Sequence, residues 1–262
     1  MFLKTLETWF LWLMIYSIMG WIYESTLCSV RSHKFINRGF LNGPYCPIYG
    51  SGALLVILIL GRITNPVLLF FLGAIVTCSL EYATSYLMEK LFHARWWDYT
   101  KRKFNINGRV CLIGAVVFGA FSVLIVLVVH PFVEGLTDKL PDIARHVLSA
   151  SLFAIFAADN AVTIAGFSGF HKKMAELAAF LEQQKASAAS RIQSSGAYKE
   201  MREFNEAIKS KLNLQQRRMV KAFPALKMKK PDYDKALQKL RDTLEKSKML
   251  KKIKSEKSEK GS

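Results

Sequence analysis

The sequence has 262 residues, of which 51% are hydrophobic, yet its formal net charge is +17. These two properties do not fit one soluble domain, but they are compatible if apolar residues and charges occupy different parts of the chain. From His171 to the end there are 24 Lys/Arg and 11 Asp/Glu, a net charge of +13, whereas residues 1–170 have a net charge of +4. The composition therefore argues against a soluble globular protein and predicts an apolar domain over residues 1–170, followed by a basic domain over residues 171–262.

Long uncharged runs in the first domain predict membrane-spanning helices. A helix needs about 20 mostly apolar residues to cross a bilayer core of about 30 Å. Five segments approach this requirement, and the second of them is short: 5–29, 46–61, 66–89, 110–131 and 147–170. We therefore predict an all-α integral membrane protein with about five transmembrane helices.

The distribution of basic residues predicts the orientation of these helices. Loops that are rich in Lys and Arg stay in the cytoplasm. The loops after the first and third predicted helices and the segment after the fifth are strongly basic, whereas the loop after the second contains only Arg62. This pattern predicts an outside N-terminus, five spans, and a basic helical tail in the cytoplasm that is disordered at its end.

Two carboxylates lie near the inner ends of predicted helices. Glu24 belongs to the first helix and Glu81 to the third, so both are expected at similar depth in the cytoplasmic third of the membrane. Burial of a carboxylate there is costly unless the group is paired, protonated or hydrated. Arg38 and Arg109 are candidate partners on the same side. The acids either form salt bridges that fix helix packing, or line a polar site open to the cytoplasm.

A third acid, Asp159, falls in the middle of the fifth predicted helix. An acid at this depth is a functional candidate by default. The alternative is a protonated acid that is hydrogen-bonded to a neighbouring helix. The sequence does not decide between these two interpretations.

The segment NRGFLNGPYCPIYGSG, residues 37–52, is rich in residues that break helices, yet it leads directly into an apolar run. Its glycines allow close backbone approach and positive φ, and Pro44 and Pro47 prevent a regular helix. Irregular backbone at membrane depth is tolerated where it is buried in protein or lines a cavity. We expect an ordered, re-entrant approach to the second helix, packed near Glu24 and Glu81; an ordinary tight loop is the alternative.

The segment RWWDYTKRKFNINGRVCL, residues 95–112, lies at the same predicted face. Its aromatic residues suit the headgroup level of a bilayer. Asp98 is expected to pair with a nearby cation, and NING at residues 105–108 predicts a turn just before the fourth helix. We therefore interpret this segment as an interfacial anchor.

These segments resemble one family, the ABC-transporter type IV or CmpB-like membrane proteins, many of which carry the label of an ABC transporter permease. The matching pieces are GWIYES (20–25), FINRGFLNGPYCPIYGSGAL (35–54), LEYATSYLMEKLF (80–92) and WWDYTKRKFNINGRVCL (96–112). The resemblance implies transport, a separate ATPase subunit and a bacterial plasma membrane (inner or cell membrane). It points to a candidate polar binding site, with candidate residues Glu24, Asn37, Arg38, Glu81, Asp98, Tyr99, Asn105 and Arg109. It also points to a structural motif made of Gly39, Gly43, Pro44, Pro47, Tyr49, Gly50, Trp97 and Gly108.

The basic domain contains three narrow apolar stripes at helical spacing. They begin at Met174, Met201 and Leu237 and are flanked by Lys, Arg and Glu. Such helices can pair as a coiled coil or hairpin, or lie on an anionic membrane surface. Residues 217–230 mix cations with Met, Val and Phe, as a membrane-surface segment does. Anionic lipid is therefore a candidate partner, whereas no groove-reading motif is present and nucleic acid is not expected.

No motif for nucleotide hydrolysis or for a hydrolase nucleophile occurs in the sequence, so enzymatic activity stays undecided. We predict no cofactor and no metal site, and the four cysteines contain no C-x-x-C pair. Three functions fit these observations. The first is a permease-like transport component, which is expected to form a homo-oligomer in the lipid bilayer. The second is a membrane enzyme that acts on lipid headgroups or lipid-linked substrates, and the third is a non-catalytic scaffold or regulator.

Overall fold

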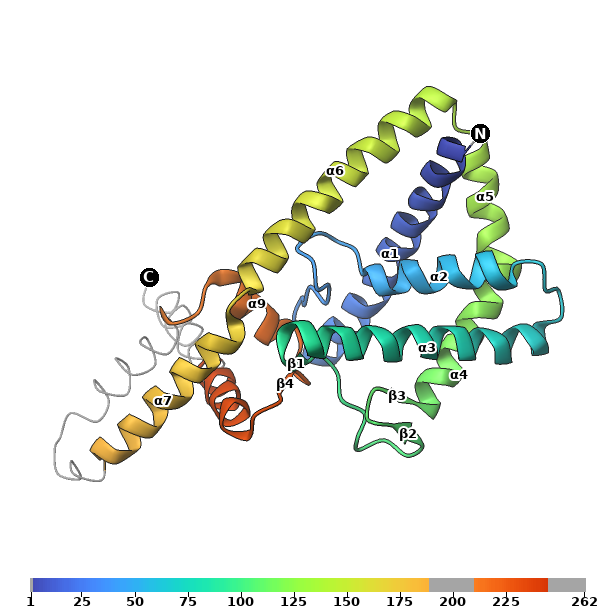
Figure 1. Ribbon diagram of the computed structural model, residues 1–262. Coiled ribbons are helices and arrows are strands. Elements are labelled where there is room, and N and C mark those ends of the chain that lie inside the picture. Colours follow the sequence, from blue (N-terminus) through green and yellow to red (C-terminus); the bar gives the residue numbers. More distant parts are fainter. Residues whose placement is uncertain (1, 189–209, 245–262) are drawn as a thin grey trace, which may run out of the picture. The chain divides into compact units, whose positions relative to one another are not determined.

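The computed structural model describes residues 2–188 and 210–244 (Figure 1). The chain divides into two compact units, Met1–Met88 with Trp97–Ala165, and Glu89–Trp96 with Gly166–Ser262. The described residues are mostly helical, as predicted. The exceptions to an all-α fold are two antiparallel strand pairs of two residues per strand.

The first unit is built from long helices and one small hairpin. Helices α3 and α6 begin in this unit, and each continues by a few residues into the second unit. In chain order the elements are α1 (Phe2–Ser32), α2 (Pro47–Leu60), α3 (Pro66–Phe92), β2 (Asn105–Ile106), β3 (Val110–Cys111), α4 (Leu112–Leu124), η1 (Ile125–Val129), α5 (His130–Asp138) and α6 (Asp142–Phe167).

Three helices in the described part of the chain are long and apolar enough to cross a membrane: Pro66–Phe92, Leu112–Asp138 and Asp142–Gln183. They correspond to the third, fourth and fifth predicted spans. The second predicted span is α2, whose 14 residues are too short to cross a bilayer alone. The first predicted span is α1, which has 31 residues. It is not one of these three helices, because its tryptophans, tyrosines and serines lower its mean hydropathy. The structure thus supports three candidate spans, and the five-span arrangement and its direction remain predictions.

Large apolar side chains are exposed along these three helices, where a soluble protein would bury them. Examples are Val67, Phe71, Ile75, Val128, Phe132, Phe153, Ile155 and Val162, each of which is at least 60% exposed. Apolar faces of this size are unfavourable in water but are solvated by lipid tails. The chain is therefore a membrane protein.

The helix Leu112–Asp138 contains one π-helical turn, at Ile125–Val129. The cause is Pro131, which has no amide hydrogen and whose ring crowds the carbonyl of Leu127. A single π turn absorbs this clash without breaking the helix. His130, at the end of this turn, is buried with its ring centroid 4.5 Å from that of Trp12.

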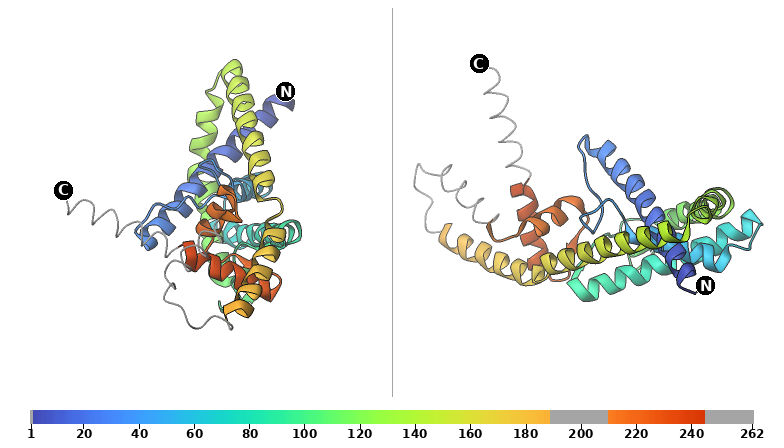
Figure 2. Two further views of the ribbon diagram at one scale, coloured as in Figure 1. Left: turned by 90° about the vertical axis from the view of Figure 1, so that its left-hand side faces the viewer. Right: turned by 90° about the horizontal axis from the view of Figure 1, so that it is seen from above.

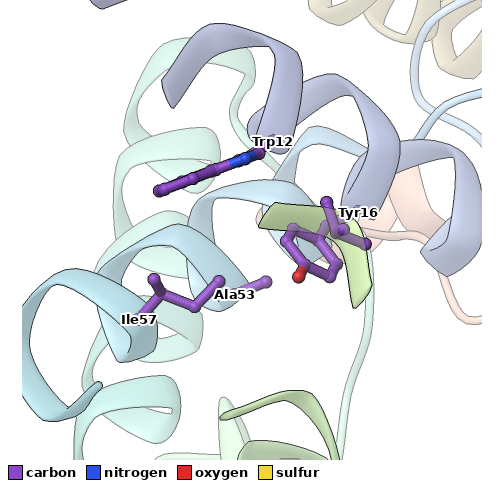
Figure 3. Packing of buried hydrophobic residues seen from close by; sticks show 5 residues of the cluster. Trp12, Tyr16, Ala53 and Ile57 are labelled. Atoms are coloured by element: carbon purple, nitrogen blue, oxygen red, sulfur yellow. The ribbon is translucent and has the colours of Figure 1, made fainter. Parts of the chain in front are cut away.

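Helix α2 packs against the N-terminal half of α1. Trp12 and Tyr16 of α1 form a buried cluster with Ala53 and Ile57 of α2 (Figure 3) and with Val133 of α5. Lipid tails are as apolar as these side chains, so burial alone does not bring membrane helices together. Close packing does, and in this contact it depends on glycine: a Cβ atom on Gly50 would meet the Ser17 hydroxyl and the Leu13 carbonyl.

Residues 105–111 form a hairpin directly before α4, where the sequence predicted a turn. Strands β2 and β3 pair antiparallel, and the amide of Arg109 donates to the carbonyl of Ile106 at 3.0 Å. The two central residues, Asn107 and Gly108, have φ of 52° and 66°. These values fit the type I′ turn that Asn-Gly favours.

The second unit has its own core around strand pair β1 (Ala94–Arg95) and β4 (Lys227–Met228), helices α7 (Phe170–Ala188) and α9 (Leu214–Ala222), and a further helix over residues 231–244. The interpretation of residues 217–230 as a membrane-surface segment is wrong. Their apolar side chains are buried in this unit, because β4 pairs with β1 and α9 packs inward: Met219, Val220, Phe223, Leu226 and Met228.

The apolar stripes that begin at Met174 and Leu237 also face this core. They therefore belong to a folded unit with aromatic side chains, among them Trp96 and Phe167, whose ring centroids lie 5.3 Å apart. The stripe that begins at Met201 and the expected disordered end lie outside the described residues. The assignment of residues 171–262 to the cytoplasm remains a prediction.

Candidate functional site

Residues 33–46 return along the C-terminal half of α1 before α2 begins. Hydrogen bonds join this segment to α1, among them Ile36 N to Ser29 Oγ (3.0 Å), Arg38 N to Ser25 Oγ (3.3 Å), Trp21 Nε1 to Asn37 Oδ1 (2.8 Å) and Cys46 N to Ser17 O (2.8 Å). Because Ser17 is at the middle of α1, helix α2 starts halfway along its neighbour. Figure 2 shows the segment, in light blue, beside α1. The segment is therefore ordered and returns along α1; it is termed the re-entrant segment, and its depth in the membrane remains a prediction.

Asp159, on α6, holds the tip of this segment. Its Oδ1 accepts hydrogen bonds from the backbone amide (3.1 Å) and side-chain amide (2.9 Å) of Asn42 and from the Thr163 hydroxyl (3.1 Å). Its Oδ2 accepts from the Gly43 amide (2.8 Å) and the Tyr45 phenol (2.6 Å). Each of these partners is a donor, and a carboxylate can accept from several donors at once. Asp159 therefore anchors the re-entrant segment.

Glu24 lies where the re-entrant segment joins α2. Its Oε1 accepts a 2.6 Å hydrogen bond from the Tyr49 phenol, and its Oε2 lies 3.6 Å from Arg38 Nε. The side chains of Glu24 and Arg38 are 27% and 19% exposed. The expected pair with Arg38 is thus present. Tyr49 was expected only as part of the structural motif, yet its phenol also contacts this carboxylate.

Glu81, on α3, is more deeply buried than Glu24 and has fewer hydrogen-bond and ion-pair partners. It is 6% exposed, and its Oε1 accepts a 3.2 Å hydrogen bond from the Tyr99 phenol. Its Oε2 is buried and has no hydrogen-bond partner among the described residues. The charge of Glu24 acts electrostatically on Glu81. Glu81 is therefore a buried carboxylate with one oxygen available for a further partner.

Tyr99 is held in place by the compact loop over residues 95–112. Its amide donates to the Gly108 carbonyl at 2.8 Å, and the Trp97 indole donates to the Arg109 carbonyl at 2.9 Å. A side chain on Gly108 would meet Asp98 and Thr100. Burial, and next the negative charge of Glu81, raise the pKa of Tyr99 above its ordinary value near 10. The phenol is therefore a neutral donor to Glu81 at physiological pH.

Arg109 was expected as a partner of the inner carboxylates, but it does not bind Glu81. Its Nη1 donates to Ser85 Oγ at 3.1 Å, and its guanidinium lies 5.5 Å and 5.4 Å from the ring centroids of Tyr82 and Tyr86. Arginine stacks readily on aromatic faces, and α3 presents two tyrosines one helical turn apart. Arg109 thus attaches the loop to α3 without neutralising Glu81.

The other predicted site residues support the loops. Asn37 Oδ1 accepts from Trp21 and from the Gly39 amide, and its side-chain nitrogen donates to the Asn42 carbonyl. Asn105 bonds to the backbone of Thr100, Arg102 and Gly108, and Asp98 accepts from Thr100. Pro44 lies in the re-entrant segment, and Pro47 begins α2, where a missing amide hydrogen costs nothing.

The sequence did not indicate two residues that donate hydrogen bonds to Asp159, namely Asn42 and Tyr45. Both lie in the glycine-rich and proline-rich stretch, but no local signal connects them with an acid more than 110 residues away. Within the described chain, no group of three or more His, Cys, Asp or Glu is arranged to hold a metal ion.

Fold and site together define a helical membrane protein in which a re-entrant segment and a structured loop bring polar groups to three carboxylates, of which Glu81 is buried. A family model described as "Putative ABC-transporter type IV" matches residues 11–164, and the chain belongs to this family. No curated protein and no solved structure matches the chain. The family and the apolar helices are those of a membrane transport component, for which an ATPase is a candidate partner.

Proposed function

We propose that this chain is the membrane-spanning component of a transporter, and that Glu24 and Glu81 form its polar site at the cytoplasmic face. One observation carries the proposal: Oε2 of Glu81 is buried without a partner while a second carboxylate lies within electrostatic range. Two carboxylates in a low-dielectric setting favour a shared proton or a bound cationic group between them. The site would therefore accept a cationic group of the substrate, or a proton that moves with it.

The proposed topology has five crossings and an outside N-terminus. The re-entrant segment and α2 together make the second crossing, because a 14-residue helix that starts halfway along α1 needs to cover only the outer half of the bilayer. The basic loops and the second unit then lie in the cytoplasm of a bacterial cell. They are the surfaces available to a separate ATPase.

Affinity purification of the intact chain in mild detergent tests the transporter assignment. We expect an ATPase to co-purify in fixed ratio and to hydrolyse ATP in reconstituted vesicles. Glu81→Gln should retain this partner, because an amide oxygen still accepts from Tyr99, but should lose substrate-stimulated hydrolysis. An intact chain that repeatedly purifies with no ATPase would contradict the assignment.

Cysteine labelling tests the topology independently. In a background without the four native cysteines, Phe2→Cys should react with a membrane-impermeant maleimide on intact cells. Lys101→Cys, in the loop before α4, should react only after the membrane is permeabilised. Both residues are exposed, so accessibility reports their side of the membrane. Labelling of both positions on intact cells would rule out the proposed orientation.

A further inference from the structure

Four side chains with donor groups meet in the second unit, close in sequence to the ends of α3 and α6. His93 directly follows α3, and His171 is the second residue of α7, while Lys230 and Tyr233 lie at the start of the helix over residues 231–244. The ring centroids of His93 and His171 are 4.9 Å apart, and those of His171 and Tyr233 are 5.0 Å apart. Lys230 Nζ lies 5.2 Å from the Tyr233 centroid. These four residues are termed the His93 cluster.

Backbone contacts bring the four residues of the His93 cluster together. Strand pairing sets Ala94 opposite Met228, and the amide of Lys229 donates to the carbonyl of His93 at 3.4 Å. His93 has φ of 53°, an uncommon value for a residue other than glycine. This conformation turns the chain sharply between α3 and β1 next to the start of α7.

The polar side-chain atoms of the His93 cluster are available to a ligand. Among the described residues, the imidazoles of His93 and His171, the ammonium of Lys230 and the phenol of Tyr233 make no side-chain hydrogen bond or ion pair. His93 and Lys230 each act electrostatically on His171. Donor groups are thus held together with no hydrogen-bonding partner from the described side chains.

The acids nearby in the sequence are engaged elsewhere and do not neutralise the cluster. Asp232 pairs with Lys235 at 3.6 Å, and Asp234 accepts from the Met228 amide at 3.1 Å. Near the start of α7, Glu176 pairs with Lys173 at 3.2 Å. The acids of the described residues thus leave the cluster open to an anionic ligand.

We propose that the His93 cluster binds a phosphate group. Phosphate offers several acceptor oxygens and negative charge to one ammonium, two imidazoles and one phenol. A metal ion fits poorly, because the cluster has only two ligating side chains and a neighbouring cation. Since His93 directly follows α3 and His171 lies shortly after the end of α6, the cluster is expected at headgroup level, where the phosphate of an anionic phospholipid is abundant. Free phosphate is the other source of the same chemistry.

Nuclear magnetic resonance of the full chain, with labelled histidine rings, tests this proposal in two arms. In detergent, inorganic phosphate is added at constant ionic strength. In lipid nanodiscs, phosphatidylcholine alone is compared with a mixture that contains phosphatidic acid. We expect saturable shifts of the His93 and His171 signals, which are assigned with His93→Asn and His171→Asn.

Lys230→Gln should weaken this binding about tenfold, as loss of one charge-assisted contact does. Its matched control is Lys235→Gln, which removes an exposed lysine from the same helix and should change the affinity about twofold or less. Shifts with inorganic phosphate identify a site for soluble phosphate, and shifts only in nanodiscs identify a lipid headgroup site. No saturable shift in either arm, or equal losses in the two lysine variants, would overturn the proposal.

Discussion

The phenol of Tyr45 donates a 2.6 Å hydrogen bond to Asp159, which lies 114 residues further along the chain. The same carboxylate accepts from the backbone of Asn42 and Gly43. One acid on α6 therefore holds the irregular segment that precedes α2. The proposed polar site depends on this anchor, because the segment carries Arg38 to Glu24 and leads directly to Tyr49.

Asp159→Asn should destabilise the protein by about 1–3 kcal/mol, because an amide cannot accept from all these donors and loses the charge-assisted bonds. The apparent melting temperature in detergent should fall, measured by tryptophan fluorescence. Asp138→Asn, at an exposed position on α5, is the control and should have little effect. Equal melting temperatures for the two variants would mean that Asp159 does not anchor the segment.

Gly50→Ala should disturb the contact between α1 and α2. The added methyl group meets the Ser17 hydroxyl and the Leu13 carbonyl, and overpacking of this kind costs about 1–3 kcal/mol. The monodisperse fraction in size-exclusion chromatography should therefore drop. Gly135→Ala, where nothing lies within 4 Å of the new atom, should elute like the native chain. A normal profile for Gly50→Ala would show that the helices are further apart than described.

Tyr99→Phe should flatten the stability profile at high pH. The pKa of this phenol is raised in the folded state, first by burial and then by Glu81, so the unfolded state loses its proton at lower pH. The resulting stabilisation is complete below about pH 10 and is lost as pH rises above that value.

Melting temperatures measured between pH 8 and pH 11.5 check this prediction (the range is set by the ordinary tyrosine pKa of about 10). The native chain should lose stability more steeply than Tyr99→Phe above about pH 10. Tyr233→Phe, at a partly exposed position in the second unit, is the comparison. Parallel profiles for the native chain and Tyr99→Phe would contradict the described burial of the phenol.

Leu237→Ala should unfold the second unit selectively. Leu237 is fully buried, and such a truncation costs about 2–5 kcal/mol. Limited proteolysis should then cut the chain after α6 at lower protease concentration. Leu214→Ala removes a side chain that is 82% exposed and should leave the cleavage pattern unchanged. Unaltered resistance of Leu237→Ala would mean that residues 217–244 are not a packed core.

Much of the architecture was predictable because its signals are local. Hydropathy over about 20 residues identified α3, α4 to α5, and α6. The Asn-Gly pair identified the hairpin before α4, since both residues tolerate positive φ. Pairing of Glu24 with Arg38 was also expected, because Arg38 lies in the basic loop directly after the helix that carries Glu24.

Other features were not predictable, because they depend on contacts between distant segments. Arg109 binds Ser85 and two tyrosines instead of Glu81, and the choice follows from how the loop docks on α3. Residues 217–230 looked like a membrane-surface segment, since an amphipathic stripe has the same composition whether it faces lipid or a protein core.

Composition and hydropathy were sufficient to predict an apolar helical membrane chain with a basic C-terminal third and the motifs of its family, because solvation of each segment depends on its own side chains. The pairing of Asp159, and the buried Oε2 of Glu81 that has no partner among the described residues, came only from the arrangement of distant segments. A buried polar group is satisfied only by the groups that the fold brings within hydrogen-bonding distance.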